Sequence, residues 1–139
     1  MPRIYVDASV LIAALLSSTG ASAAILNIIR SKRAVGIISQ TVINEVLAHE
    51  KKIGKSSKII QEFLLIHGFL VRRRVTKEDV APYRGSIDPE DAHLVAAAIS
   101  TRCDCLVTLD KKHLLNPIIK KRFLPLRILS PKELLKEFT

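Results

Sequence analysis

The chain has 139 residues, 48% of them apolar, and this length and composition suit one domain with one continuous core over residues 1–139. Its apolar runs are too short to span a bilayer and no signal-peptide pattern begins the chain, so we expect a cytoplasmic protein without membrane contact. The formal net charge of +9 favours polyanionic partners such as nucleic acid, although solvated surface lysines account for it equally well.

Short apolar runs that suit strands alternate with helical patterns from the N-terminus onward. This order is typical of βαβ units and predicts an α/β fold, with a parallel sheet and helices on both of its faces. Between the first two strands, the apolar spacing of Ala24, Ile25, Ile28 and Ile29 predicts an amphipathic helix, and a second helical face lies at 59–64. The predicted strands are 3–6, 35–38, 70–75, 105–109 and 126–129.

Local signals predict where two later helices begin and where one strand lies in the sheet. Asp88 and Ser130 are each followed by proline, which is favoured at the first helical position, so both are predicted N-caps. Glu133 is placed to complete a capping box with Ser130. The run 72–74 puts three arginines in the third strand, so at least one points toward a face of the sheet. This strand is therefore expected at an edge.

Three of the acidic residues lie at or just beyond the ends of predicted strands. Asp7 directly follows the first strand, Asp110 follows the fourth, and Glu45 lies about one turn into the helix after the second. The carboxyl ends of parallel strands meet at one edge of the sheet, where open α/β proteins gather functional groups. Asp91, in the first turn of its helix, has apolar residues at i+3, i+4 and i+7 and so borders the face that packs on the sheet. These acids are the candidate catalytic residues.

Each of these acids also has a structural interpretation. Asp7 could cap the following helix, Asp110 could begin a turn, and Asp91 could serve the helix dipole beside an N-cap at Asp88. Glu45 could lie on a solvated edge, although its helical neighbours are expected to leave it partly buried. Taken together these interpretations weaken, because carboxylates gathered at one edge repel each other unless a cation neutralises them. Carboxylate oxygens without cysteine or histidine at ligand spacing favour Mg²⁺ or Mn²⁺, which activate water for phosphodiester hydrolysis.

The acids lie within short segments that occur in a fixed order along the chain. These are IYVDASVLI at 4–12, Ser39 with Glu45, DAHLVAAA at 91–98 and LVTLD at 106–110. In this pattern the chain resembles the PIN-domain ribonucleases, a family that includes the VapC toxins of prokaryotic toxin-antitoxin pairs. The resemblance implies a three-layer α/β/α sandwich with a five-stranded parallel sheet, cleavage of single-stranded RNA, homodimers and, for a toxin, an antitoxin partner.

The resemblance also assigns roles to residues, and the chain departs from the family at two points. It implies that one or two Mg²⁺ or Mn²⁺ ions are held by Asp7, Glu45, Asp91 and Asp110, with Ser9 and Thr108 as supporting hydroxyls. Many relatives carry a further Asp just after the fourth acid, where this chain has Lys111, Lys112 and His113. A second ion would then need Asp88 or Glu90. Many toxins have Asn in place of Ser9.

Basic residues near the predicted metal ligands are candidates for RNA binding. Lys111 and Lys112 directly follow Asp110 and are expected to border the cleft at the height of an incoming phosphate. Further basic clusters at 51–58, 72–74 and 120–122 could extend this surface. We do not expect His93 or His113 to act as an essential general base, because metal-activated water supplies the nucleophile. His93 is also placed about 200° round the helix from Asp91.

Two other functions stay open at this level. The fold could serve as a non-catalytic module that binds nucleic acid or docks an antitoxin protein, and the absence of stabilisation by Mn²⁺ would indicate such a module. A phosphotransfer enzyme or receiver domain also collects acids at strand ends. The segment following the first strand, DAS at 7–9, lacks the paired acids that those chemistries use.

Overall fold

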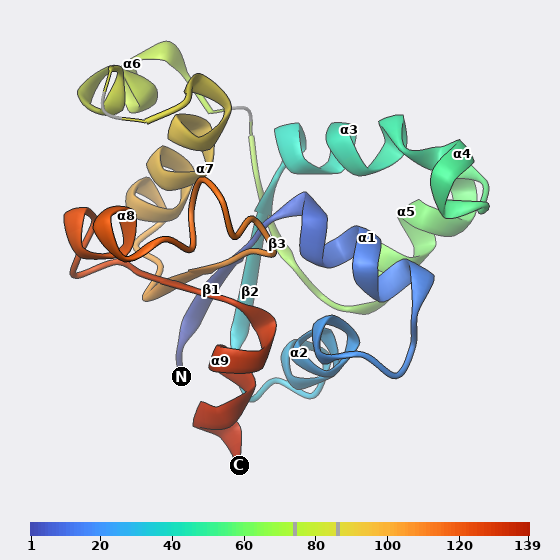
Figure 1. Ribbon diagram of the computed structural model, residues 1–139. Helices are drawn as coiled ribbons and strands as arrows, with labels where there is room; N and C mark the ends of the chain where they lie inside the picture. The colour runs from blue at the N-terminus through green and yellow to red at the C-terminus, as the bar shows by residue number, and fades with distance from the viewer. Residues whose placement is uncertain (74, 86) are drawn as a thin grey trace.

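The computed structural model describes residues 1–73, 75–85 and 87–139, and a sheet of five parallel strands lies at its centre (Figure 1). The strand order is β3-β2-β1-β4-β5, so the first strand is the middle one. Ile4 in this strand is in register with Gly36 on one side and with Cys105 on the other. The predicted α/β class with a five-stranded parallel sheet is confirmed. The strands are β1 (Arg3–Val6), β2 (Val35–Ser39), β3 (Leu70–Arg72), β4 (Cys105–Val107) and β5 (Arg127–Leu129).

Helices cover both faces of this sheet. Figure 1 shows α7 and α8 on one side and α1 and α2 on the other, with α3, α4 and α5 beyond α1. The C-terminal helix α9 packs against α2 and β5. The helices are α1 (Ala8–Leu16), α2 (Ala21–Arg30), α3 (Gln40–Ala48), α4 (Glu50–Ile53), α5 (Ser57–Ile66), α6 (Lys77–Val80), α7 (Pro89–Ser100), α8 (Pro117–Arg122) and α9 (Pro131–Leu135), with short 3-10 turns at Ala81–Tyr83 and Lys136–Phe138.

The strand sequences follow from burial on both faces. Ile4, Tyr5 and Val6 in β1 are at most 1% exposed, because helices cover both sides of the central strand. A parallel sheet covered in this way selects continuous apolar runs instead of alternating ones. In β2, Gly36 allows close packing, since a Cβ at this position would lie 2.7 Å from a methyl carbon of Ile29 and 2.8 Å from the ring of Phe69.

The helix starts predicted from the sequence are confirmed. The Ser130 hydroxyl accepts a hydrogen bond from the N–H of Glu133 at 3.1 Å, and the Glu133 carboxylate accepts one from the N–H of Ser130 at 3.0 Å. This capping box opens α9. The Asp88 carboxylate accepts a hydrogen bond from the N–H of Glu90 at 3.0 Å and opens α7.

Strand β3 lies at an edge of the sheet, as its arginines predicted. It ends at Arg72, earlier than the sequence suggested, and Arg74 falls outside the described residues. The Arg72 guanidinium donates to the Ser100 hydroxyl at 2.5 Å and pairs with the Asp79 carboxylate at 3.4 Å. At the edge of the sheet the Arg72 guanidinium can reach these partners, whereas in a central strand its charge would be buried.

Membrane-spanning potential is limited to one bent pair of helices. Across the described ranges, no single helix is long and apolar enough to cross a membrane. The pair α1 and α2 passes the test of length and composition together, but the two helices are bent by 102° at their junction. Most of their apolar side chains are buried in this fold.

The carboxyl ends of the three central strands define the edge of the sheet that matters for function. From β1 the sheet extends to β2 on one side and to β4 on the other, so the chain order reverses at this point. Open α/β sheets bind ligands outside the carboxyl ends of strands at such a reversal. Asp7 follows β1, Ser39 ends β2 and Thr108 follows β4, so polar side chains meet here.

Candidate active site

A cavity of about 650 Å³ opens at this edge of the sheet, and all four acids selected from the sequence line it. Asp7 comes from the end of β1, Glu45 from α3, Asp91 from the first turn of α7 and Asp110 from the turn after β4. Four separate segments therefore bring carboxylates to one cavity. A structural role for each acid alone would not require this convergence.

Asp7 is 7% exposed and is held by hydroxyl groups. It occupies the N-cap position of α1, but its side chain makes no capping hydrogen bond, so the capping interpretation is wrong. Its Oδ2 instead accepts hydrogen bonds from Ser9 Oγ and Thr108 Oγ1, both at 2.7 Å. Ser9 Oγ accepts the N–H of Leu109 at 3.1 Å, and Thr108 Oγ1 accepts the N–H of Asp110 at 3.1 Å. These bonds tie the end of β1 to the segment after β4.

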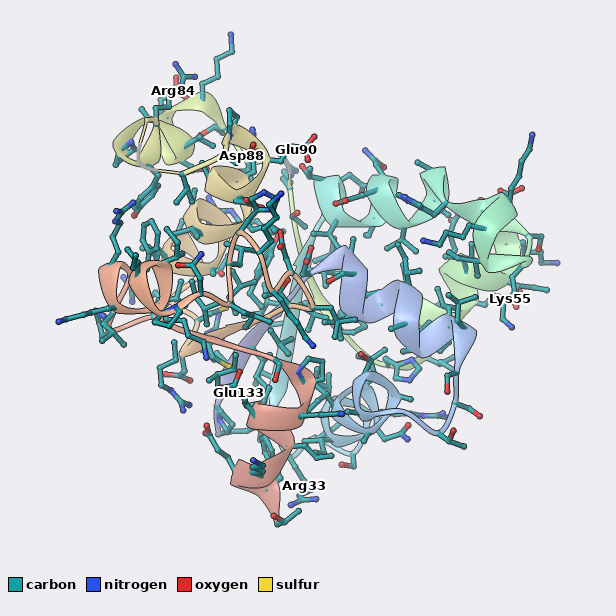
Figure 2. The ribbon with its side chains drawn as sticks, in the orientation of Figure 1. Arg33, Lys55, Arg84, Asp88, Glu90 and Glu133 are labelled. Atoms are coloured by element: carbon teal, nitrogen blue, oxygen red, sulfur yellow. The ribbon has the colours of Figure 1, made fainter. Side chains whose placement is uncertain are left out.

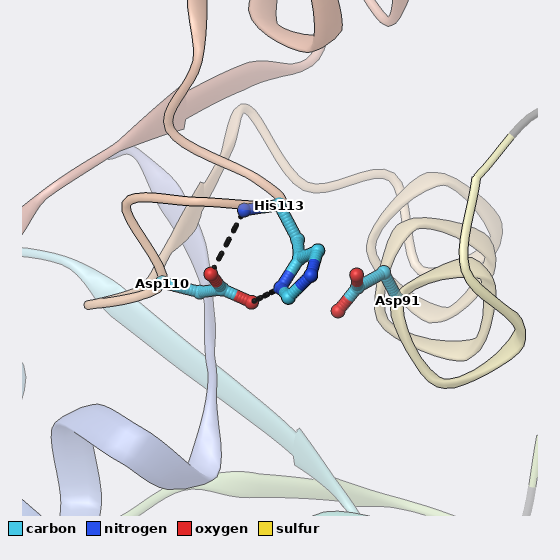
Figure 3. Close-up of side chains that lie close together, drawn as sticks. All are labelled: Asp91, Asp110 and His113. Carbon is cyan, nitrogen blue, oxygen red and sulfur yellow. Dashed lines mark hydrogen bonds and ion pairs between the residues drawn. The ribbon is translucent and has the colours of Figure 1, made fainter.

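Asp110 begins the turn that follows β4 and also faces a histidine (Figure 3). Its Oδ1 accepts the backbone N–H of His113 at 2.9 Å, and its Oδ2 lies 3.2 Å from Nδ1 of the same residue. Figure 3 shows the imidazole between the carboxylates of Asp110 and Asp91. One ligand atom from each of these residues lies within 4.8 Å of the other two. Asp110 thus shapes the turn and also belongs to a group that could hold a metal ion.

Asp91 is 8% exposed, and its carboxyl group is the most perturbed acid of the cavity. The pKa of Asp91 is raised to about 6, chiefly by burial and in addition by the nearby carboxylates of Asp110 and Asp88, with His113 opposing them. Its place in the first turn of α7 favours the charged form through the helix dipole, but burial and like charge outweigh that effect. A cation bound here would reverse the balance.

Glu45 is exposed, which corrects the expectation that it is partly buried. Helix α3 turns Val42 and Val46 into the core, and Glu45 lines the cavity with its carboxylate partly desolvated. Its pKa is raised, first by desolvation and then by the carboxylates of Asp7 and Glu90. Glu45 therefore interacts electrostatically with the other acids despite its exposure.

The other residues predicted for the site have different positions. Asp88 is exposed at the N-cap of α7, while Glu90 lines the cavity; Figure 2 labels both at this helix end. Lys111 and Lys112 are exposed in the turn after Asp110, and neither is among the described residues that line the cavity. Their expected contact with RNA stays a prediction.

Several residues of the cavity were not selected from the sequence. Tyr5 donates its buried hydroxyl to Ser39 Oγ at 2.8 Å, and burial raises the pKa of Tyr5 to about 12. His49 and Lys52 also line the cavity, so one lysine of the 51–58 cluster reaches it. Lys52 lies in α4, seven residues after Glu45, and this helical spacing was the signal that could have identified it.

The two histidines near the site also differ from expectation. Helical spacing predicted that His93 lies on another face of α7 than Asp91. In the structure His93 lines the same cavity as Asp91 and also a second cavity of about 420 Å³. His113 was considered only as a general base and as a departure from the family pattern. Its position three residues after Asp110, in a turn, was the signal for a shared role.

The donor groups fit a divalent cation. Carboxylate oxygens are the preferred ligands of Mg²⁺ and Mn²⁺, and the cavity collects five carboxylates, among which the charges of Asp91 and Glu45 are disfavoured by neighbouring acids. The imidazole of His113 adds a nitrogen donor beside two of them. The arrangement can therefore neutralise its own repulsion by binding a metal ion.

Comparison with known protein families matches residues 3–112 to the PIN domain. Several solved structures have a similar fold. The protein PAE2754 from Pyrobaculum aerophilum has a TM-score of 0.62 and 20% identity, covering 98% of this chain and 88% of that one. VapBC2 from Rickettsia felis, bound to a DNA fragment from their promoter, has a TM-score of 0.62 and 16% identity, covering 92% and 98%. VapC20 from Mycobacterium tuberculosis, a sarcin-ricin loop cleaving toxin, has a TM-score of 0.58 and 17% identity, covering 78% and 91%. No curated protein matches the chain.

Proposed function

The chain belongs to the PIN-domain family, and from this premise we propose that it is a Mg²⁺- or Mn²⁺-dependent endoribonuclease that hydrolyses phosphodiester bonds of single-stranded RNA. The observation that carries the proposal is the convergence of Asp7, Glu45, Asp91 and Asp110 on one cavity at the carboxyl edge of the sheet. The raised pKa values of Asp91 and Glu45 support it, because each is due in part to the neighbouring carboxylates.

The acids of the cavity would hold the metal, and their environment suits that role. When bound, the ion neutralises charge on the phosphate and activates water for attack on phosphorus. The Ser9 and Thr108 hydroxyls orient Asp7 through its Oδ2, and within the described residues no donor is bonded to its Oδ1. Asp91 carries a carboxyl group that is partly protonated near pH 6 and loses its proton when a cation enters.

Basic side chains around the cavity would hold the RNA backbone. Lys52 lines the cavity, and Lys111 and Lys112 lie on the exposed turn that follows Asp110. Lys120, from another basic cluster, is instead paired with Glu133 at 2.9 Å and is less available. The net charge of +9 adds a general attraction for the polyanion.

The proposal extends to partners. We propose that the protein is the toxin of a toxin-antitoxin pair and that it forms a homodimer in the cytoplasm, in keeping with its family resemblance. The similarity in fold to VapBC2 and VapC20 supports the proposed toxin role. Co-expression with the product of an adjacent reading frame, followed by co-purification, tests the antitoxin. Light scattering of the purified protein tests the dimer.

Cleavage of a fluorescent single-stranded RNA tests the nuclease. Product should form with Mg²⁺ or Mn²⁺ and not with EDTA, and Asp7→Asn and Asp110→Asn should abolish it. Asp104→Asn is the matched control, because Asp104 precedes β4 at the other edge of the sheet and its amide can still accept the N–H of Arg3. Equal loss in Asp104→Asn would show that charge removal anywhere inactivates the protein, and the site assignment would fail.

The alternative is a PIN-fold module that binds RNA or protein without catalysis. It is distinguished by metal: a binding module without a metal site should show no rise in melting temperature with Mn²⁺, since only a ligand bound to the native state stabilises it. A nuclease with this cavity should show such a rise in the wild type and a smaller one in Asp110→Asn.

A further inference from the structure

We infer that His113 is a direct metal ligand, so that the site combines one imidazole nitrogen with carboxylate oxygens and binds Mn²⁺ and later transition metals in preference to Mg²⁺. The inference rests on the proposed metal site and specifies its chemistry. It begins from the group formed by His113, Asp110 and Asp91, whose ligand atoms all lie within 4.8 Å of one another (Figure 3).

The backbone fixes where the His113 ring can lie. Its N–H donates to Asp110 Oδ1 at 2.9 Å, and the N–H groups of Leu114 and Leu115 both donate to the Asp110 carbonyl oxygen, at 3.3 and 2.9 Å. Leu114 is fully buried and anchors this turn in the core. The imidazole is therefore positioned by main-chain bonds although its own side chain is about half exposed.

The position of the His113 ring suits coordination of a metal ion together with the two carboxylates. Nδ1 lies 3.2 Å from Asp110 Oδ2, and Asp91 lies on the other side of the ring. Histidine binds metals through the lone pair of a ring nitrogen, and a ring nitrogen of His113 lies within 4.8 Å of a carboxylate oxygen of each of the two acids.

A nitrogen ligand changes which ions the site prefers. Mg²⁺ takes oxygen ligands almost entirely, whereas imidazole suits Mn²⁺ less than Co²⁺, Ni²⁺ or Zn²⁺ but is accepted by all of them. The substitution His113→Asp would therefore convert the mixed site to oxygen ligands alone.

Electron paramagnetic resonance of bound Mn²⁺ tests the inference without measuring activity. Electron spin-echo modulation from a coordinated ¹⁴N nucleus should be present in the wild-type protein and absent in His113→Ala and His113→Asp. Mn²⁺ affinity should fall at least about tenfold in His113→Ala, because even outer partners of metal ligands are worth that much. His113→Asp should restore Mn²⁺ affinity, and it should lower the ratio of Co²⁺ affinity to Mg²⁺ affinity.

His93→Ala and His49→Ala are the matched controls, because both histidines line the same cavity outside the three-residue group. Each should retain the ¹⁴N modulation. Mn²⁺ bound without ¹⁴N modulation, or modulation lost in a control and kept in His113→Ala, overturns the inference about His113 and leaves the proposed nuclease standing. A wild-type protein that binds no Mn²⁺ overturns both. Circular dichroism of each variant confirms that the fold is intact.

Discussion

Replacing Asp91 by Asn should stabilise the metal-free protein at neutral pH and have little effect in acid. The carboxyl group of Asp91 has a pKa of about 6 in the folded state against 3.8 as its ordinary value, because burial and the carboxylates of Asp110 and Asp88 disfavour its charge. The folded protein therefore binds more protons than the unfolded chain between about pH 4 and 6. Stability falls as pH rises through that window, and the loss is complete above it.

The size of the effect follows from the shift. A difference of about two pKa units corresponds to roughly 3 kcal/mol, at 1.36 kcal/mol per unit. Asp91 lines an open cavity, so solvent screening reduces this to about 1–2 kcal/mol. Loss of a carboxylate in the first turn of α7 costs about 0.5 kcal/mol of helix-dipole interaction. The net gain for Asp91→Asn is about 1 kcal/mol at pH 8, which is a few degrees in melting temperature for a chain of this size.

The assay is urea unfolding of both proteins in EDTA across pH 4 to 8. The difference in unfolding free energy, variant minus wild type, should be close to zero or slightly negative at pH 4 and should rise to its plateau above pH 6. Glu62→Gln, an exposed substitution in α5, controls for the change in net charge and should give a difference that is flat across this window. A flat difference for Asp91→Asn, or one that falls with pH, would refute the argument that the cavity disfavours this charge.

Four further predictions concern other residues. Asp7→Asn should abolish metal-dependent cleavage of RNA while the metal-free protein keeps its unfolding free energy, because an amide oxygen can still accept both hydroxyls now bonded to Oδ2; an unfolded variant would make Asp7 structural. His93→Ala should retain cleavage, and a loss as large as that of Asp7→Asn would make it a catalytic residue. Exchanging Lys111 and Lys112 together for Gln should weaken RNA binding and reduce its salt slope by about one unit per lost phosphate contact, without changing Mn²⁺ affinity. Gly36→Ala should cost about 1–3 kcal/mol in thermal unfolding, because its Cβ would meet Ile29 and Phe69 at less than 3 Å.

The class of fold could be predicted from the sequence because its signals are local. A strand enclosed on both faces must be apolar throughout, so β1 and β4 are visible as runs in the sequence. Helix starts are visible in the same way, as Ser130 and Glu133 show, because a capping box needs only two residues three positions apart. Acids that directly follow parallel strands must then share one edge of the sheet, and chain order alone therefore predicts that Asp7 and Asp110 lie together.

The details of the site depend on contacts between segments far apart in the chain, and the sequence pattern does not encode them. The exposure of Glu45 depends on how α3 is turned against the sheet, whereas helical spacing alone predicted partial burial. His93 lies between two cavities and lines both of them, which helical spacing alone does not predict. The place of His113 between Asp110 and Asp91 combines a turn after β4 with the beginning of α7, which only the packing of α7 on the sheet brings within 4.8 Å. Periodicity determines which residues can share a face of one element, whereas the direction of a side chain in a turn is decided by the tertiary structure around it.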